Sequence, residues 1–313
     1  MLIAFFRSWL RWLDKNNDVP PIGNPFRLPT IPSPWHVPCY NPAMSTSFVF
    51  SLMALAAMVP VPIVRFRAGE GRDALFWGVL LLAVAGPGAW AVAQFHESWR
   101  TSFAVALWVS IAATMGLFCF VAAFTRQGWR LTLLLVPYLL ILGGLATIWG
   151  GHSARPLAGG VPAGWVDVHI VLAVVTYGLL TIAAVAGTAV LLQEEALKAK
   201  RTNALSRRLP ALSDAERLEV TLLWTVEAVL ACGLISGMAA QHFLDGRLLA
   251  FDHKTVFSLA SFAVIGTLLL AHRRTGIRGR RAARFVLLAY LLLTLGFLGV
   301  KFVTDVIMVG AGP

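Results

Sequence analysis

Residues 168–192 read VHIVLAVVTYGLLTIAAVAGTAVLL, an apolar run of 25 residues that carries no Asp, Glu, Lys or Arg. About 20 apolar residues are enough for a helix to cross the hydrocarbon core of a bilayer. A helix is the form that such a segment takes, because backbone groups in lipid must find their hydrogen bonds within the segment itself. This stretch therefore predicts a transmembrane helix with a histidine, His169, near one end.

Runs of the same kind recur along the chain, so we expect an all-α, polytopic membrane helix bundle of about eight transmembrane helices. The composition agrees, with 58% hydrophobic and 13% charged residues, whereas soluble domains carry roughly 25% charged residues. The predicted spans are Ser47–Val64, Ala74–Phe95, Ser102–Phe124, Leu131–Trp149, Val168–Leu192, Val220–Phe243, Thr255–Ala271 and Phe285–Val309.

Basic residues are concentrated in the loops after the first, third, fifth and seventh spans. Because such loops stay in the cytoplasm, this alternation predicts that both termini lie outside. The net charge of +11 is then a topology signal, and we expect no nucleic-acid partner. The residues are Arg65, Arg67, Arg72, Arg126, Arg130, Lys198, Lys200, Arg201, Arg207, Arg208, Arg217, Arg273, Arg274, Arg278, Arg280, Arg281 and Arg284.

The first 43 residues differ from the rest and are treated as an N-terminal extension (1–43) to the transmembrane domain (44–313). MLIAFFRSWLRWL is typical of an amphipathic surface helix, and the Pro-rich stretch after it is not expected to form a packed fold. Two starts of the natural chain stay open, Met1 and Met44.

Motifs of several enzyme classes are missing from the sequence. The three cysteines, Cys39, Cys119 and Cys232, form no CxxC or zinc-binding spacing. There is also no Walker loop, no Ser/His/Asp set and no catalytic carboxylate pair. We therefore expect a binding or assembly factor rather than an enzyme.

Five of the seven histidines fall at the predicted outer ends of the spans, and His169 and His253 open the fifth and seventh spans. Imidazole is the commonest metal ligand, and cofactor sites in bundles are built from side chains on facing helices. Haem fits such a site, since its ring tolerates apolar walls and its iron accepts imidazole. His169 and His253 are therefore our candidate axial ligands of the iron. The alternative is that these histidines only bond to headgroups, water or backbone carbonyls.

Three ionisable residues inside the spans leave further alternatives open. Lys301 and Asp305 share a helix face, so Lys301 either forms a local ion pair or neutralises a haem propionate. Glu227 lies about two turns into the sixth span, where an unpaired charge is costly. It is either a proton-relay group or a neutral, hydrogen-bonded acid.

The segment between the fifth and sixth spans is predicted to be helical and cytoplasmic. Gln193–Leu209 continues the fifth span as a polar helix. In LPALSDAERLE, Ser213 followed by Glu216 predicts an N-cap at Ser213 for the next helix.

The second half, from about Val168 to Met308, resembles the CcsA/CcmC-type cytochrome c assembly proteins, and within them the shorter eight-helix YpjD-like or HemX-like branch. The motifs that carry the resemblance come in the same order. They are DVHIVLAVVTYGLLTIAAVAGTAVLLQEEALK, LPALSDAERLE, GLISG, DHKTVFSLASF and GIRGRRAARFVLLAYLLLTLGFLGVKFV. The resemblance implies a multi-pass protein of the bacterial inner membrane that binds or passes haem on the outer side. His169, the His253–Lys254 pair, Gly279, Arg280 and Lys301 match recurring positions of that family.

The sequence departs from the larger members of that family at one important place. Their Trp-rich outer loop, WGxxWxWD, is replaced here by FDHK, and Ile277 stands where a Trp is common. We expect non-covalent binding of haem b by His169, His253 and Lys301, with covalent attachment left to another cytochrome c assembly component. Two rival functions are a cofactor-free scaffold that uses Gln193–Leu209 and a small-molecule or ion transporter that uses Glu227.

Overall fold

The structure is a computed structural model and describes residues 42–67, 71–96, 100–150, 155–156, 163–200, 203–246 and 252–307. The chain divides into two units, Met1–Asn41 and Pro42–Pro313, and all described residues belong to the second unit. The predicted N-terminal extension thus lies outside the described residues, apart from its last two.

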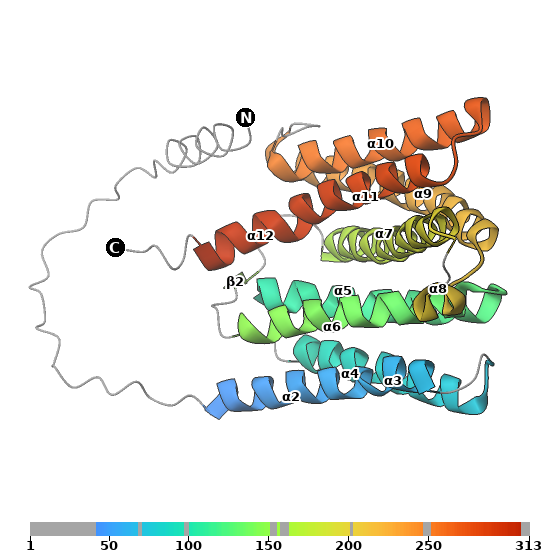
Figure 1. Ribbon diagram of the computed structural model, residues 1–313. Helices are drawn as coiled ribbons and strands as arrows, with labels where there is room; N and C mark the ends of the chain where they lie inside the picture. Colours follow the sequence, from blue (N-terminus) through green and yellow to red (C-terminus); the bar gives the residue numbers. More distant parts are fainter. Residues whose placement is uncertain are drawn as a thin grey trace, which may run out of the picture. The chain divides into compact units, whose positions relative to one another are not determined.

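The predicted all-α class is confirmed, and eight helical segments are long and apolar enough to cross a membrane (Figure 1). The described helices are α2 (Pro42–Met58), α3 (Pro60–Arg67), α4 (Ala74–His96), α5 (Phe103–Phe124), α6 (Thr132–Ile148), α7 (Ala163–Lys198), α8 (Ala204–Arg208), α9 (Leu212–Asp245), α10 (His253–Thr275), α11 (Arg280–Thr294) and α12 (Val300–Phe302). Short elements join them, namely the 3-10 turn η1 (Gly128–Leu131), the π-helical turns η2 (Leu295–Gly299) and η3 (Val303–Ile307), and the antiparallel pair β1 (Arg100–Thr101) and β2 (Arg155–Pro156).

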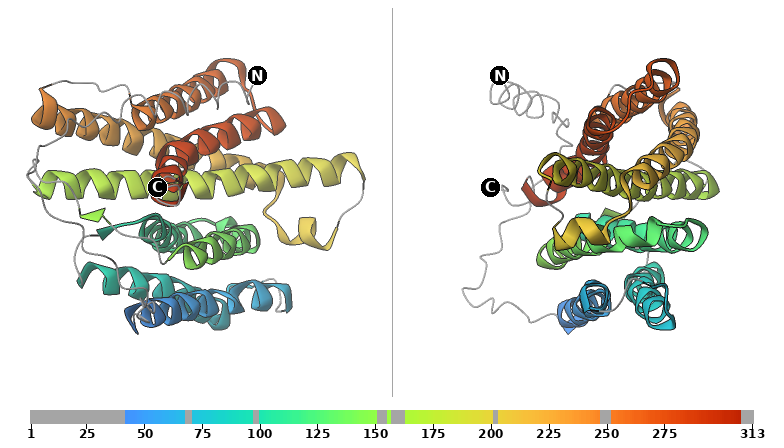
Figure 2. Two further views of the ribbon diagram at one scale, coloured as in Figure 1. Left: turned by 90° about the vertical axis from the view of Figure 1, so that its left-hand side faces the viewer. Right: turned by 45° about the vertical axis from the view of Figure 1, so that its right-hand side comes forward.

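Helix α7 is the centre of the bundle. Both views of Figure 2 show α9, α10 and α11 on one side of α7 and α2 to α6 on the other. Small residues allow α7 and α11 to pack closely. A methyl group at Gly187 of α7 would lie 3.5 Å from Cα of Ala283 on α11. Since α7 contacts α9 and α11, and α10 contacts the same two helices, these four helices form a closed ring.

The outer faces of the spans are covered by large apolar side chains. Phe120, Ile141, Ile148 and Ile235 are examples of residues that are more than half exposed. An apolar surface of this extent marks contact with a membrane. The chain is therefore a multi-pass membrane protein.

Two expectations for the polar segment after the fifth span are wrong. The polar helix Gln193–Leu209 is interrupted, because α7 ends at Lys198 and Lys200 takes a left-handed conformation with φ of 48°. The chain then turns back, and Nε2 of Gln193 donates to the carbonyls of Ser206 and Pro210 at 2.9 and 2.8 Å.

The predicted N-cap of the next helix is also displaced. Helix α9 is capped by Ala211, whose carbonyl accepts from the amides of Asp214 and Ala215 at 3.0 and 2.9 Å. Ser213 therefore lies inside the first turn and does not cap the helix.

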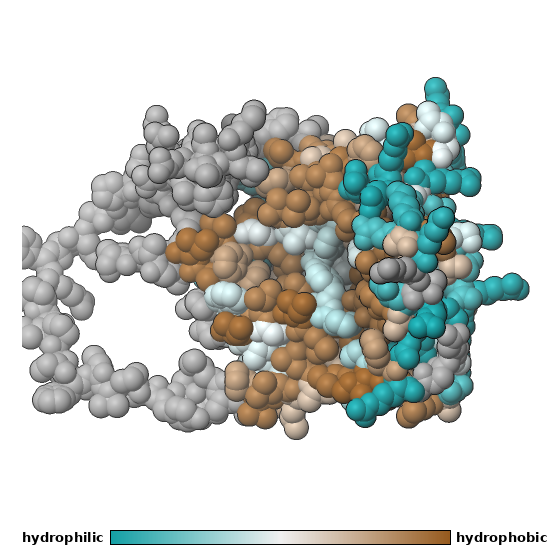
Figure 3. Space-filling model, in the orientation of Figure 1, coloured by the Kyte–Doolittle hydropathy of each residue, from teal (hydrophilic) through white to brown (hydrophobic). Residues whose placement is uncertain are grey.

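The basic loops of the predicted cytoplasmic side all lie at one end of the bundle, where Figure 3 shows hydrophilic residues gathered. They are tied together by arginines that donate to distant carbonyls. Arg72 bonds to Thr125 and Arg126, and Arg208 bonds to Arg65 at 3.2 Å. These bonds link loops that are far apart in sequence and fix this end of the bundle.

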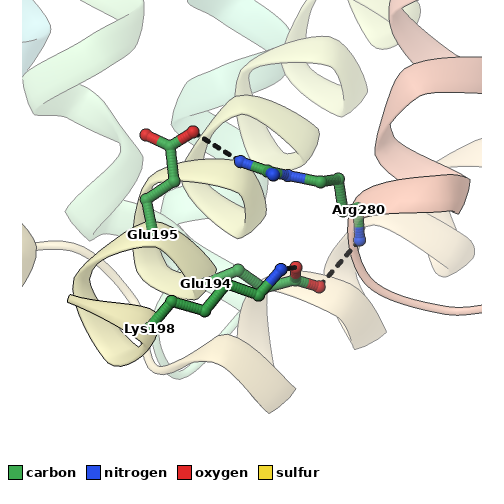
Figure 4. A network of polar contacts seen from close by, with 4 residues as sticks. All are labelled: Glu194, Glu195, Lys198 and Arg280. Atoms are coloured by element: carbon green, nitrogen blue, oxygen red, sulfur yellow. Dashed lines mark hydrogen bonds and ion pairs between the residues drawn. The ribbon is translucent and has the colours of Figure 1, made fainter. Parts of the chain in front are cut away.

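The recurring Gly279–Arg280 pair has a structural role at the same end (Figure 4). The Arg280 amide donates to Oε1 of Glu194 at 2.7 Å, and its guanidinium pairs with Glu195 at 2.5 Å. A carboxylate on the free amides of a helix start is favourable because of the helix dipole. Gly279 has φ of 63°, and a side chain there would overlap the Glu194 carboxylate. This contact locks the start of α11 to the end of α7.

Candidate functional site

The opposite end of the four-helix ring contains an apolar cavity of about 280 Å³. Residues from α7, α9, α10, α11, η2 and α12 line it. Its apolar wall includes Ile170, Ala173, Leu230, Leu234, Leu293 and Phe297, and its polar groups come from His169, Thr176, Tyr177, Lys254, Ser258 and Lys301. An apolar pocket with a few convergent polar groups is the usual form of a ligand site.

His169 is placed in this cavity by the helical repeat of α7. His169, Ala173, Thr176 and Tyr177 follow one another at intervals that keep them on one face. The ring fits against α9 only because position 237 is glycine, where a methyl group would lie 3.0 Å from Cε1 of His169. The imidazole is therefore held between α7 and α9.

One ring nitrogen of His169 has no hydrogen bond to the described residues. Its Nδ1 atom is buried and makes no hydrogen bond of acceptable geometry to a described residue, although the backbone of Gly233 lies near the ring. A buried polar atom without a partner is unusual in a native protein and calls for an explanation. This side of the ring lies against α9, where a methyl group at position 237 would be 3.6 Å from Nδ1.

A second cavity, of about 230 Å³, adjoins the first. Both cavities are lined by His169, Gly233, Leu234, Lys254 and Ser258. Gln241, Asp252 and Thr255 add polar groups to the second one, nearer the ends of α9 and α10. His169 and Lys254 thus belong to the walls of both spaces.

His253, the other predicted iron ligand, is the first residue of α10 and is half-buried. Successive residues of a helix point about 100° apart, and it is Lys254 that lines the two cavities. His253 makes an interaction of its own with the surrounding protein. Its pairing with His169 across a haem stays a prediction.

Lys301 also lines the first cavity, together with His169, and its contact with a haem propionate stays a prediction. It forms no ion pair with Asp305, the alternative that the sequence left open. Oδ1 of Asp305 accepts from Thr304 at 3.2 Å, and Oδ2 is buried without a hydrogen bond to the described residues.

Three tyrosines meet below the cavity, and the sequence did not predict this cluster. Tyr290 on α11 bonds through its hydroxyl to the hydroxyls of Tyr138 on α6 and Tyr177 on α7, the latter at 3.0 Å. Tyr177 lines the cavity and packs against Phe297, with ring centroids 5.7 Å apart. The only signal in the sequence is scarcity, since the whole chain has four tyrosines.

Glu227 lies outside both cavities, one turn from Leu230. A methyl group at Gly266 of α10 would lie 2.8 Å from Oε1 of Glu227. The other oxygen, Oε2, is buried without a hydrogen bond to the described residues. The carboxyl group therefore lies at the α9–α10 interface, apart from the cavity.

The other histidines whose side chains the structure describes are not gathered at the site. His242 is exposed near the end of α9, and Nδ1 of His272 is 2.9 Å from the Ile277 carbonyl at the basic end. His96 is the last residue of α4, whereas His36 and His152 lie outside the described residues. In the described parts of the chain, no three His, Cys, Asp or Glu side chains gather as a metal-binding group.

The fold and the cavity define a polytopic helical membrane protein with a largely apolar cavity near one end of its C-terminal four-helix ring. Residues 77–308, more than half of the chain, match the family described as Cytochrome C assembly protein. The chain belongs to this family.

Three relatives illustrate the match. The "uncharacterized 28.8 kDa protein in nifR3-like 5′region" of Azospirillum brasilense is 52% identical over 270 residues, which cover 85% of this chain and 100% of that protein. Protein HemX of Brevibacillus brevis is 28% identical over 42% of this chain and 48% of its own length. Inner membrane protein YpjD of Escherichia coli K12 is 28% identical over 60% of this chain and 69% of its own length.

Proposed function

We propose that this protein binds haem b non-covalently and reversibly in the cavity beside His169 and presents it for cytochrome c assembly. The observation that carries the proposal is that His169 lines a cavity of about 280 Å³ whose wall is largely apolar. Membership of the cytochrome c assembly family supports the same function.

The residues present fit a haem. Apolar side chains such as Leu230 and Phe297 would cover the ring, and the ammonium groups of Lys254 and Lys301 would face acidic substituents. His169, and His253 in the first turn of α10, would be the residues that hold the iron. Bound haem would supply an iron centre whose behaviour is set by its axial ligands and by the polarity of the pocket.

The protein's own part is to hold, orient and release its ligand. Gly237 holds the imidazole of His169 in place by close contact. Because FDHK replaces the Trp-rich loop of the larger family members, we propose that covalent attachment is carried out by another assembly component.

The proposed orientation follows from the two ends of the bundle. His169 lies near the start of α7, and Lys198, with the basic loops, lies at its other end. The positive-inside rule puts the basic end in the cytoplasm, so the cavity opens near the outer face and both termini lie outside. The name of the relative YpjD, an inner membrane protein, supports a bacterial inner membrane. Cysteine labelling from either side of sealed vesicles tests this orientation.

The function is tested by absorption spectra of the protein purified with added haem. A Soret band that is lost in His169→Ala and weakened or shifted in His253→Ala is expected. His242→Ala is the matched control, since His242 is exposed and lines neither cavity. A protein that stays colourless after haem is added contradicts the proposal and favours the cofactor-free scaffold.

The same experiment distinguishes the contribution of His169 to iron binding from that of His253. Loss of the band in His169→Ala alone supports one axial ligand and removes His253 from the site. An unchanged spectrum in His169→Ala contradicts the assigned cavity, even if the protein binds haem elsewhere.

A further inference from the structure

We propose that Lys254 and Lys301 form a two-cation clamp that selects a ligand with two acidic groups, so that the cavity takes a tetrapyrrole dicarboxylate rather than any flat apolar molecule. This inference rests on the proposed function and specifies the chemistry of its ligand.

The two lysines reach one cavity from different elements. Lys254 belongs to the first turn of α10, and Lys301 belongs to α12. Both line the cavity beside His169. Two like charges at the edge of an apolar space are unfavourable unless an anion lies between or beside them.

Among the side chains that the structure describes, neither ammonium group has a carboxylate partner. The ion pairs among the described residues, Lys198–Glu194 and Arg280–Glu195, are at the opposite end of the bundle. Asp252, the acid nearest to Lys254 in sequence, caps α10 by accepting from the Thr255 amide at 2.8 Å.

Asp305, the acid nearest to Lys301 in sequence, forms no ion pair with it, and its Oδ1 atom accepts from Thr304 at 3.2 Å. A cation that faces a cavity without an ion-pair partner is suited to bind the anionic part of a ligand. Two such cations indicate a ligand with two anionic groups.

The close packing of α10 against η2 fixes the distance between the lysines. A methyl group at Gly296 would lie 2.8 Å from Cβ of Phe257 and 3.7 Å from the carbonyl oxygen of Lys254. Gly296 belongs to the π-helical turn η2, and such turns occur frequently at functional sites. The extra residue in this turn helps to set the direction in which Phe297 and Lys301 face.

The rest of the cavity excludes a small hydrophilic dianion as the preferred ligand. Ala173, Leu230, Leu293 and Phe297 form an apolar wall beyond the lysines. Burial of an apolar ring against this wall is favourable, whereas a hydrophilic body would lose its hydration. The site therefore combines an apolar body with two acidic groups at one edge.

The test uses the full chain in lipid nanodiscs and three probes, namely haem, metal-free protoporphyrin IX and the neutral dimethyl ester of protoporphyrin IX. Binding of the metal-free probes is followed by quenching of tryptophan fluorescence, with empty nanodiscs as the blank. Because these two probes contain no iron, the result does not depend on His169 as a ligand.

The wild-type protein should bind the diacid roughly 10- to 100-fold more tightly than the diester, since hydrogen bonds to charged groups are stronger than those between neutral groups. The Lys254→Gln/Lys301→Gln double variant should bind both probes with the affinity of the ester. Lys198→Gln, at the basic end, is the matched control and should keep the preference for the diacid.

The outcomes separate this inference from the proposed function. Equal affinity for diacid and diester in the wild type, with a Soret band that depends on His169, overturns the clamp and leaves haem binding intact. A preference for the diacid that depends on the lysines, with no change of the haem spectrum in His169→Ala, supports the clamp and overturns iron ligation. A protein that binds none of the three probes overturns both.

Discussion

The imidazole of His169 on α7 packs directly on Gly237 of α9, where a methyl group would lie 3.0 Å from Cε1 and 3.6 Å from Nδ1. This contact sets the direction of the ring that we propose as the iron ligand. We expect Gly237→Ala to tilt the ring and to weaken haem binding by roughly 10-fold or more, as do changes that misorient metal ligands. Titration of the Soret band measures the effect.

The matched control for this substitution is Gly144→Ala on α6, because a methyl group at Gly144 meets no atom within 4 Å. It should leave haem affinity unchanged. If Gly237→Ala binds haem like the wild type while His169→Ala does not, the contact with Gly237 has no part in orienting the ligand.

Acid should release haem from the site. An imidazole binds iron only in its neutral form, so protonation competes with ligation and the affinity must fall as the pH falls. Between about pH 8 and about pH 5, the range in which histidine titrates, we expect a progressive loss of the Soret band that reverses on return to neutral pH. The loss should be absent from the metal-free porphyrin, whose binding does not use the histidine.

The spans could be predicted from the sequence because length and apolar character are properties of a single segment. Val168–Leu192 falls within α7 for this reason. The residues at which the helices end are harder to predict, because helix ends depend on local backbone contacts. The interruption after Lys198 follows from the left-handed Lys200 and from the bonds of Gln193 to the returning chain.

The site was predicted in part. His169 and Lys301 line one cavity, as their positions near the same ends of their spans suggested. Lys254 was not singled out as a wall residue, because the rotation of α10 about its axis is set by packing against η2 and not by sequence spacing. The tyrosine cluster has no local signal either, since Tyr138 and Tyr290 are 152 positions apart.

The lock at the start of α11 gives a prediction about stability. Gly279→Ala would place a methyl group on the Glu194 carboxylate and break its bond to the Arg280 amide. The backbone there, with φ of 63° and ψ of −143°, is also close to a region that is essentially limited to glycine. We expect a loss of about 2–4 kcal/mol in stability, measured as a lower Tm in detergent.

Gly276→Ala is the comparison for Gly279→Ala. Gly276 has a similar φ of 68°, but a methyl group there meets no atom within 4 Å. It should cost only the backbone strain, about 1–2 kcal/mol. Equal losses in Tm for the two variants would show that the contact with Glu194 adds nothing to the strain.

Glu227 provides a test of the boundary of the site and of the rival transport function. Its Oε2 atom is buried at the α9–α10 interface without a hydrogen bond to the described residues, and its side chain lines neither cavity. Glu227→Gln keeps the shape and removes the charge, which is costly within a membrane span. We expect an unchanged Soret band and a Tm that is equal to or higher than that of the wild type. A weakened band would extend the haem site to Glu227, and proton flux into vesicles that disappears in this variant would favour the transporter.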